Sequence, residues 1–179
     1  TRDAIDTKVT YQGKEYTFID TAGLRRKNKI KEELERYSII RTVTAVERAD
    51  VVVMMIDATE GVTEQDAKIA GIAHDRGKGV VIAVNKWDAI EKNDKTIYKF
   101  TNKVRETLSY MPYAEIMFIS AHTGQRIPKL FETIDMVLEN QTLRIQTGVL
   151  NEIITEATAL QQPPSDKGKR LKIFYTTQV

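Results

Sequence analysis

VVIAVNKWD, at residues 80–88, joins an unbroken apolar run to a polar motif. A β-branched run without alternation is typical of a strand that is buried on both faces, as in a parallel sheet covered by helices. A second run of the same kind, VVVMMI at residues 51–56, lies earlier in the chain. The two runs therefore predict buried strands of a parallel sheet.

Helices are expected around these strands, where apolar residues recur at near-helical spacing. One expected helix ends near Ala49, and three others cover residues 64–76, 96–110 and 127–138. A third strand is expected over residues 116–120. Strands that alternate with long helices favour right-handed βαβ units. We therefore predict an α/β fold with a doubly wound, mostly parallel sheet, whose ligands bind at the carboxyl ends of the strands.

Two segments outside this series have other patterns. Residues 8–20 form two alternating segments around a glycine-containing turn, which predicts a β-hairpin. Near the C-terminus, residues 147–160 have the spacing of an amphipathic helix, the loop QPPSDKGK follows, and residues 171–175 alternate like a strand. We therefore expect a first domain over residues 1–141 and the beginning of a second α/β domain over residues 142–179.

Composition narrows the class of protein. Hydrophobic residues make up 41% of the 179 residues, which is enough to build a core, and the charged residues nearly cancel to a formal +2. The absence of cysteine excludes disulfides and thiolate metal sites, and it fits a reducing cytoplasm. The longest apolar runs are too short to cross a bilayer. We expect a cytoplasmic protein whose partners include neither a membrane nor DNA.

Three short polar motifs directly follow predicted strands: DTAG at residues 20–23, NKWD at residues 85–88, and the pair Ser120-Ala121. Each motif alone is explained as readily by a turn or a loop, and NKWD arises by accident in about one chain in fifty of this size. Their order and their common place at strand ends make coincidence remote. We predict that NKWD and Ser120-Ala121 flank a single ligand.

These two motifs match the hydrogen-bonding edge of guanine. Asp88 offers two acceptor oxygens to the adjacent N1–H and N2 donors, and the backbone N–H of Ala121 is expected to meet O6. Asn85 can reach N7 and brace the loops, while the stem of Lys86 can lie over the ring. Adenine presents an amine where guanine has O6 and lacks the N2 donor, which leaves polar groups unpaired at about 1–3 kcal/mol each. The predicted pocket therefore rejects adenine.

DTAG suits the phosphates and their metal ion. The carboxylate of Asp20 can hold Mg²⁺ through a water molecule, and the backbone N–H of Gly23 can approach a γ-phosphate because glycine has no side chain. Glycine dihedrals can also change when that phosphate leaves, so the segment after Gly23 is predicted to be a switch. Asp20 and Gly23 are the candidate catalytic residues.

The three motifs resemble the switch II, base-recognition and base-support motifs of the TRAFAC class of GTPases. Thr1-Arg2-Asp3 is also similar to the end of the TTRD switch I motif in the subgroup that contains Era, the tRNA-modifying GTPase MnmE, and Der, also called EngA. By this resemblance Thr1, or the threonine just before it, supplies a Mg²⁺ ligand beside Asp20. The resemblance implies a P-loop GTPase fold.

Longer stretches narrow the resemblance to the Der (EngA) family. They are DTAGLRRKNKI, EELERYSIIRTVTAVERADVVVMMIDATEG, EQDAKIAG, VVIAVNKWDAI, LRIQTGVLNEIITEA and KGKRLKIFYTTQV. Together they are similar to the second GTPase domain of that family running into its C-terminal KH-like domain. This similarity covers essentially the whole chain.

The family resemblance implies a function and a set of ligands. It implies a GTP-hydrolysing switch that acts in large ribosomal subunit assembly, with GTP or GDP and Mg²⁺ as cofactors. The implied partners are the large subunit, ribosomal RNA and the other GTPase domain of the parent chain. The implied GTP-binding residues are Asp20, Thr21, Ala22, Gly23, Leu24, Asn85, Lys86, Asp88, Ser120 and Ala121.

One departure from the family pattern concerns the Walker A loop, G-x-x-x-x-G-K-[S/T]. The Gly-Lys pairs at residues 13, 77 and 168 are followed by Glu15, Gly79 and Arg170, so none of them qualifies. Relatives place this loop before switch I, and we therefore expect it to precede Thr1. We expect that these 179 residues alone neither bind GTP tightly nor hydrolyse it, whereas the parent protein does both.

A second departure is Leu24, which stands where Ras-type enzymes have a water-orienting glutamine. Leucine cannot orient an attacking water by hydrogen bonding, so another group is required. Relatives in this subgroup use other devices, including a K⁺ ion coordinated from the P-loop, and K⁺ is therefore a further candidate cofactor.

Some residues are interpreted as structural, and two other functions stay open. Asp57 is expected to form a turn, and Trp87 is expected to pack rather than read the base. The basic run after DTAG suits either RNA phosphates or a solvated loop. Its members are Arg25, Arg26, Lys27, Lys29 and Lys31.

The other functions are a non-hydrolysing module that binds RNA or the ribosome, and an Era-like GTPase.

Overall fold

The computed structural model describes residues 5–20, 32–166 and 168–178, except for the side chains of residues 5, 20, 32–39 and 166. The chain divides into two compact units, Thr1–Gln141 and Thr142–Val179, and each is described by itself.

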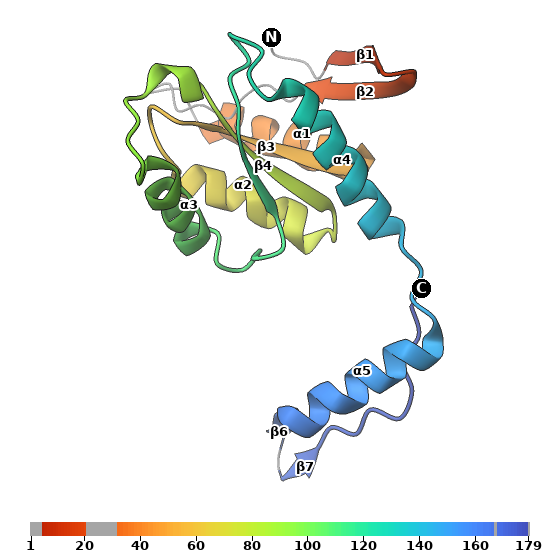
Figure 1. The fold of residues 1–179 in the computed structure, drawn as a ribbon. Helices are drawn as coiled ribbons and strands as arrows, with labels where there is room; N and C mark the ends of the chain where they lie inside the picture. Colours follow the sequence, from red (N-terminus) through yellow and green to blue (C-terminus); the bar gives the residue numbers. More distant parts are fainter. Residues whose placement is uncertain (1–4, 21–31, 167, 179) are drawn as a thin grey trace. The chain divides into compact units, whose positions relative to one another are not determined.

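A three-stranded parallel sheet forms the centre of the first unit (Figure 1). Its strands are β3 (Val51–Asp57), β4 (Gly79–Asn85) and β5 (Glu115–Phe118), with β4 in the middle. The helices of this unit are α1 (Glu32–Arg48), α2 (Glu64–Asp75), α3 (Thr96–Thr107) and α4 (Ile127–Thr142). The predicted α/β architecture with a parallel sheet is confirmed.

Strand β4 is covered on both faces, as its unbroken apolar run predicts. Val80, Ile82 and Val84 belong to one core cluster together with buried residues of α2 and α3. The side chains between them point into a second cluster, which includes Leu130 of α4. The same prediction was wrong for part of β3, where the side chain of Met55 is 47% exposed. Among the described residues β3 lies at an edge of this sheet, so along the sheet its side chains have neighbours on one side only.

The predicted hairpin consists of β1 (Ile5–Tyr11) and β2 (Lys14–Asp20), which pair antiparallel along their whole length. Gln12 and Gly13 form the turn with φ values of 49° and 80°, the left-handed pair that a two-residue hairpin turn requires. The hairpin packs on α4 through aromatic side chains. The rings of Tyr11, Tyr16 and Phe18 surround Phe131 at centroid distances of 4.3, 4.9 and 6.0 Å.

The second unit contains α5 (Thr147–Leu160), as predicted, and two short antiparallel strands, β6 (Ser165–Asp166) and β7 (Lys169–Arg170). The strand predicted over residues 171–175 was wrong, because this segment has no strand beside it, among the described residues, to complete a ladder. Side-chain hydrogen bonds hold the following residues instead. The amide of Asn151 donates to Thr176 O and accepts from Thr176 N, both at 2.8 Å.

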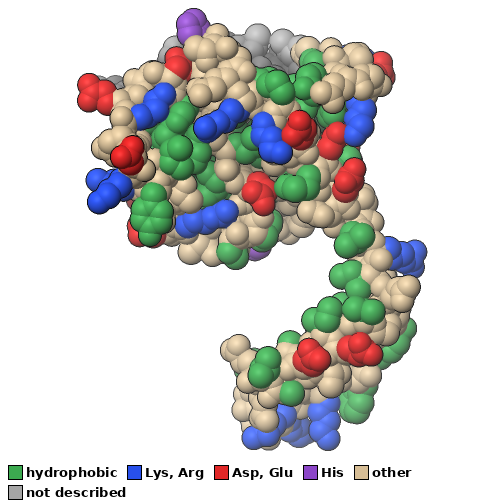
Figure 2. Space-filling model, viewed as in Figure 1, with side chains coloured by type: hydrophobic (Ala, Val, Ile, Leu, Met, Phe, Trp, Pro, Cys, Tyr) green, Lys and Arg blue, Asp and Glu red, His purple; other side chains and the backbone are tan. Residues whose placement is uncertain are grey.

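Lys and Arg side chains gather at the end of the second unit where β6 and β7 lie, in the lower part of Figure 2. Lys169, Arg170 and Lys172 are all exposed there. Within the described ranges no helix has both the length and the apolar character needed to span a membrane.

Candidate functional site

Asn85, the last residue of β4, joins the loops that follow three consecutive strands. Its side-chain Oδ1 accepts a hydrogen bond from the backbone N–H of Ala121 at 2.9 Å. Its carbonyl oxygen accepts from the N–H of Ala58, just after β3, also at 2.9 Å. The base-recognition and base-support motifs predicted from the sequence are therefore in direct contact.

A second link between the two motifs is electrostatic. The effect of the Ser120 hydroxyl on the Asp88 carboxylate is the main reason that the pKa of Asp88 lies below its usual range. Ser120 is fully buried, and its position is fixed from both sides. Its N–H donates to Gln125 O and its hydroxyl oxygen accepts from Thr123 N, each at 3.1 Å. Ser120 is thus held in a fixed place in the base-support motif.

Trp87 attaches the NKWD segment to the core. Its side chain is 2% exposed, and its ring lies 4.3 Å from that of Phe118 and 5.8 Å from that of Phe100. Its backbone N–H donates to Ile119 O at 3.1 Å. The prediction that Trp87 packs is confirmed. Asp88 directly follows Trp87 in the 3-10 turn Trp87–Ala89. The buried tryptophan therefore fixes the backbone position of Asp88.

Lys86 has a left-handed backbone, with φ 61° and ψ 31°, and its ammonium reaches Asp57 Oδ2 at 2.5 Å. Asp57 also forms the turn that was predicted for it, since its Oδ1 accepts from Thr59 N at 3.0 Å and from Thr59 Oγ1 at 2.7 Å. Burial alone would raise the pKa of Asp57, but the hydrogen bonds from Lys86 and Thr59 outweigh it and lower the pKa to about 2.

The Asp57–Lys86 pair was missed by the sequence analysis. The signal that could have revealed it is the alignment of the two buried runs. Asp57 and Asn85 are register partners on neighbouring parallel strands, so Lys86 follows the residue that lies beside Asp57.

The residues predicted for the phosphate and metal side fall largely outside the described residues. Asp20 ends β2 opposite Ile5, but nothing is described of its side chain. Thr1, Thr21, Ala22, Gly23 and Leu24, and the basic residues of the run from Arg25 to Lys31, fall in residues 1–4 and 21–31, outside the described residues. In the part that is described, no group of three or more His, Cys, Asp or Glu side chains could hold a metal ion.

The arrangement can recognise a flat polar heterocycle. Asp88 presents a carboxylate and Lys86 an aliphatic stem beyond the carboxyl end of β4, and Ala121 presents a backbone N–H beyond the carboxyl end of β5. Ligands of parallel sheets bind at these strand ends. One detail differs from the expected geometry. The N–H of Ala121 donates to Asn85 here, so a purine oxygen would have to share or replace that acceptor.

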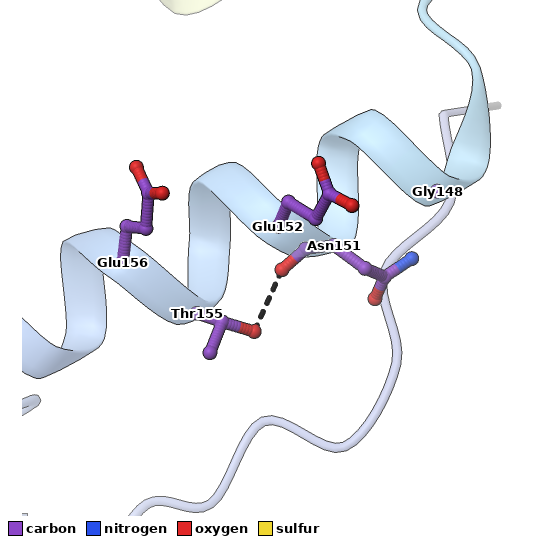
Figure 3. A pocket seen from close by; sticks show the side chains of 5 residues that line it. All are labelled: Gly148, Asn151, Glu152, Thr155 and Glu156. Carbon is purple, nitrogen blue, oxygen red and sulfur yellow. Dashed lines mark hydrogen bonds between the residues drawn. The ribbon is translucent and has the colours of Figure 1, made fainter.

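A shallow hollow on α5 is a different kind of surface. Figure 3 shows its five lining residues along a single helix: Gly148, Asn151, Glu152, Thr155 and Glu156. The carboxylates of Glu152 and Glu156 would repel the phosphates of a nucleotide. The Thr155 hydroxyl is already committed, since it donates to Asn151 O at 2.7 Å. This hollow does not suit a nucleotide.

Two families match the chain in adjoining segments. Residues 1–140 match the family described as the elongation factor Tu GTP binding domain. Residues 144–179 match the KH-domain-like family at the C-terminus of EngA bacterial GTPase enzymes.

Curated relatives cover the whole chain. GTPase Der of Lachnoclostridium phytofermentans is 77% identical over 179 residues, which are 100% of this chain and 41% of that protein. GTPase Der of Alkaliphilus metalliredigens is 60% identical over 178 residues, 99% of this chain and 40% of that protein. The chain thus spans about two fifths of the length of the curated relatives it matches.

Solved structures share the fold over most of the chain. The crystal structure of Era in complex with MgGDPNP and nucleotides 1506–1542 of 16S ribosomal RNA has a TM-score of 0.63 and 27% identity, over 75% of this chain and 44% of that one. Translation elongation factor SelB from Methanococcus maripaludis, in complex with the GTP analogue GppNHp, has a TM-score of 0.65 over 82% of this chain and 30% of that one. At 21% identity the SelB likeness shows the fold alone.

Proposed function

Because the chain belongs to the elongation factor Tu family of GTP-binding domains, we propose that it recognises guanine nucleotides as part of a GTP-hydrolysing switch in large ribosomal subunit assembly. The whole-length similarity to GTPase Der supports this proposal. The domains are then a GTPase domain over residues 1–141 and the beginning of a KH-like domain over residues 142–179.

The observation that carries the proposal is the contact between the base motifs, in which the backbone N–H of Ala121 donates to Asn85 Oδ1. This contact places the NKWD loop beside a backbone N–H, and the Ser120 hydroxyl lowers the pKa of Asp88. Guanine offers two adjacent donors and one acceptor, and this combination complements a carboxylate and an N–H. Adenine would leave polar groups without partners.

The proposed binding site for the γ-phosphate is formed by the DTAG motif. Asp20 and Thr1 would hold Mg²⁺, which in nucleotide sites is bound through one or two protein oxygens together with the phosphates. Bound there, the ion would neutralise charge on the phosphates. Gly23 would meet the γ-phosphate through its N–H, and Thr21, Ala22 and Leu24 would line the same loop. K⁺ is proposed as a further ion of the site.

Base selectivity tests the nucleotide proposal. The suitable protein is an extended chain, in which only the short segment directly before the matched region in GTPase Der of Lachnoclostridium phytofermentans, where the P-loop is expected, is joined to Thr1. Isothermal calorimetry should give a Kd for GDP at least about tenfold below that for ADP, because one unpaired buried group costs about 1–3 kcal/mol. Equal affinity for the two nucleotides would refute the guanine pocket.

Ribosomal subunits separate the main proposal from an Era-like function. The Era structure contains 16S ribosomal RNA, and the KH-like match of residues 144–179 fits contact with RNA in either case. We propose the large subunit. Co-sedimentation of the extended chain with purified subunits, with a non-hydrolysable GTP analogue, should enrich it on the large one. Enrichment on the small subunit would favour the Era-like function, and binding without nucleotide dependence would favour a non-hydrolysing RNA-binding module.

A further inference from the structure

Lys86 has an unusual backbone for its side chain. Its φ of 61° and ψ of 31° lie in the left-handed region, which glycine enters freely and a lysine enters at a cost. Residues held in this way cluster at ligand sites, where the surroundings fix them. A requirement for a side chain at this position would explain why a lysine is found here.

The side chain of Lys86 is tied down at its far end. Its ammonium pairs with Asp57 Oδ2 at 2.5 Å, while the other carboxylate oxygen of Asp57 accepts two hydrogen bonds from Thr59. These donors fix the Asp57 carboxylate, whose side chain is only 10% exposed. The lysine is attached to a rigid anchor at the carboxyl end of the neighbouring strand.

The ion pair stabilises the charged form of Asp57, but an ion pair does not by itself require a left-handed backbone at Lys86. The Lys86 side chain is 48% exposed, so solvent screens its end of the pair. The stem of Lys86, held between its backbone and Asp57, is half-exposed, so a flat ring can pack on it.

We propose that Asp57 is a positioning residue of the guanine site, which anchors Lys86 so that the lysine stem covers the purine ring. This inference rests on the proposed function. Asp57 acts through Lys86 and does not itself contact the nucleotide. Anchoring the stem beforehand would strengthen binding because less side-chain freedom is lost when the base arrives.

Two variants of the extended chain test the anchor. Asp57→Asn keeps an oxygen for Thr59 but removes the charge that holds the ammonium, and Lys86→Met keeps an apolar stem but removes the ammonium. Each is expected to raise the Kd for GDP about tenfold, and Asp57→Asn in the Lys86→Met background should add less than about twofold. Glu47→Gln is the matched control: it makes the same change from carboxylate to amide in the ion pair of Glu47 with Arg76, outside the site, so it should leave Kd unchanged.

The outcomes separate the two proposals. Loss of guanine preference in the unsubstituted extended chain would remove the proposed function and this inference with it. If guanine preference is preserved, two results would overturn the positioning role alone. One is an unchanged Kd for GDP in Lys86→Met. The other is a full tenfold rise in Kd when Asp57→Asn is added to Lys86→Met. If Glu47→Gln raises Kd as much as Asp57→Asn, the effect comes from the loss of a negative charge and not from the anchor. Circular dichroism shows whether each variant is folded. If Asp57→Asn is unfolded, the Kd of Lys86→Met decides whether the positioning role holds.

Discussion

Asp57, Lys86 and Asp88 bring three charges to the ends of two neighbouring strands, and each has a partner that fixes it. Asp57 and Asp88 both titrate below the usual range, because donors stabilise their charged forms. The polar end of the sheet is thus organised by the protein's own side chains. Organisation of this kind reduces the ordering that a nucleotide must impose.

The carboxyl of Asp57 should titrate with a midpoint of about 2. Since its pKa is lowered in the folded protein, the pair stabilises the fold above the ordinary aspartate value of about 4, and this contribution is lost as the pH falls towards the folded pKa. A ¹³C NMR titration of the aspartate carboxyls measures the midpoint. In Lys86→Met the midpoint should move up; an unmoved midpoint would mean that Lys86 does not stabilise the carboxylate.

Trp87→Ala should destabilise the protein by about 3–5 kcal/mol, because it removes a buried aromatic side chain and leaves a cavity. Urea denaturation followed by circular dichroism measures the change. Trp87→Phe keeps contact with Phe100 and Phe118 and should cost much less. A small effect of Trp87→Ala would contradict the anchoring of the NKWD segment on the core.

Among the elements, those with strong local patterns could be predicted from the sequence. The β4 run, α5 and the hairpin were placed correctly, because burial on two faces, helical spacing and a left-handed turn each leave a local signature. The segment 171–175 alternates like a strand but has no ladder partner among the described residues, which no local pattern reveals. The proximity of the NKWD and Ser120-Ala121 motifs could also be predicted, because both follow strands of one sheet. The Asp57–Lys86 pair could not, since it depends on the register between two strands.

The beginning of β4 is packed against the end of α4. A Cβ on Gly79 would lie 2.7 Å from Val137 Cγ1 and 2.8 Å from Gln141 Oε1, so Gly79→Ala should cost about 1–3 kcal/mol by overpacking. Gly71→Ala in α2 is the matched control. The atom nearest to its new Cβ is Tyr110 Oη at 3.8 Å, and replacing a helical glycine should stabilise by about 0.5–1 kcal/mol. Chemical denaturation of both variants should give shifts of opposite sign; shifts of the same sign would argue against the close approach of β4 and α4.

For the molecule as a whole, we predict from the two matched families that each unit binds a different ligand. The first unit is expected to bind the nucleotide base, and the second is expected to contact RNA. Lys169→Glu combined with Arg170→Glu should weaken binding to the large subunit and lower the salt slope by about one for each phosphate that is no longer neutralised. Sedimentation at several salt concentrations measures this. Lys99→Glu with Lys103→Glu, on α3, makes the same charge change and should leave binding intact. Equal weakening by both pairs would point to net charge rather than to the β6–β7 end.

The measurement that bears most directly on the guanine pocket is the nucleotide preference of Asp88→Asn in the extended chain. An amide at this position can donate to the O2 carbonyl of xanthine, whereas guanine has an amine there. Calorimetry should show GTP binding weakened by about 1–3 kcal/mol and xanthosine triphosphate binding improved. An unchanged ratio of the two dissociation constants would mean that Asp88 does not face the base, and the guanine pocket would have to be abandoned.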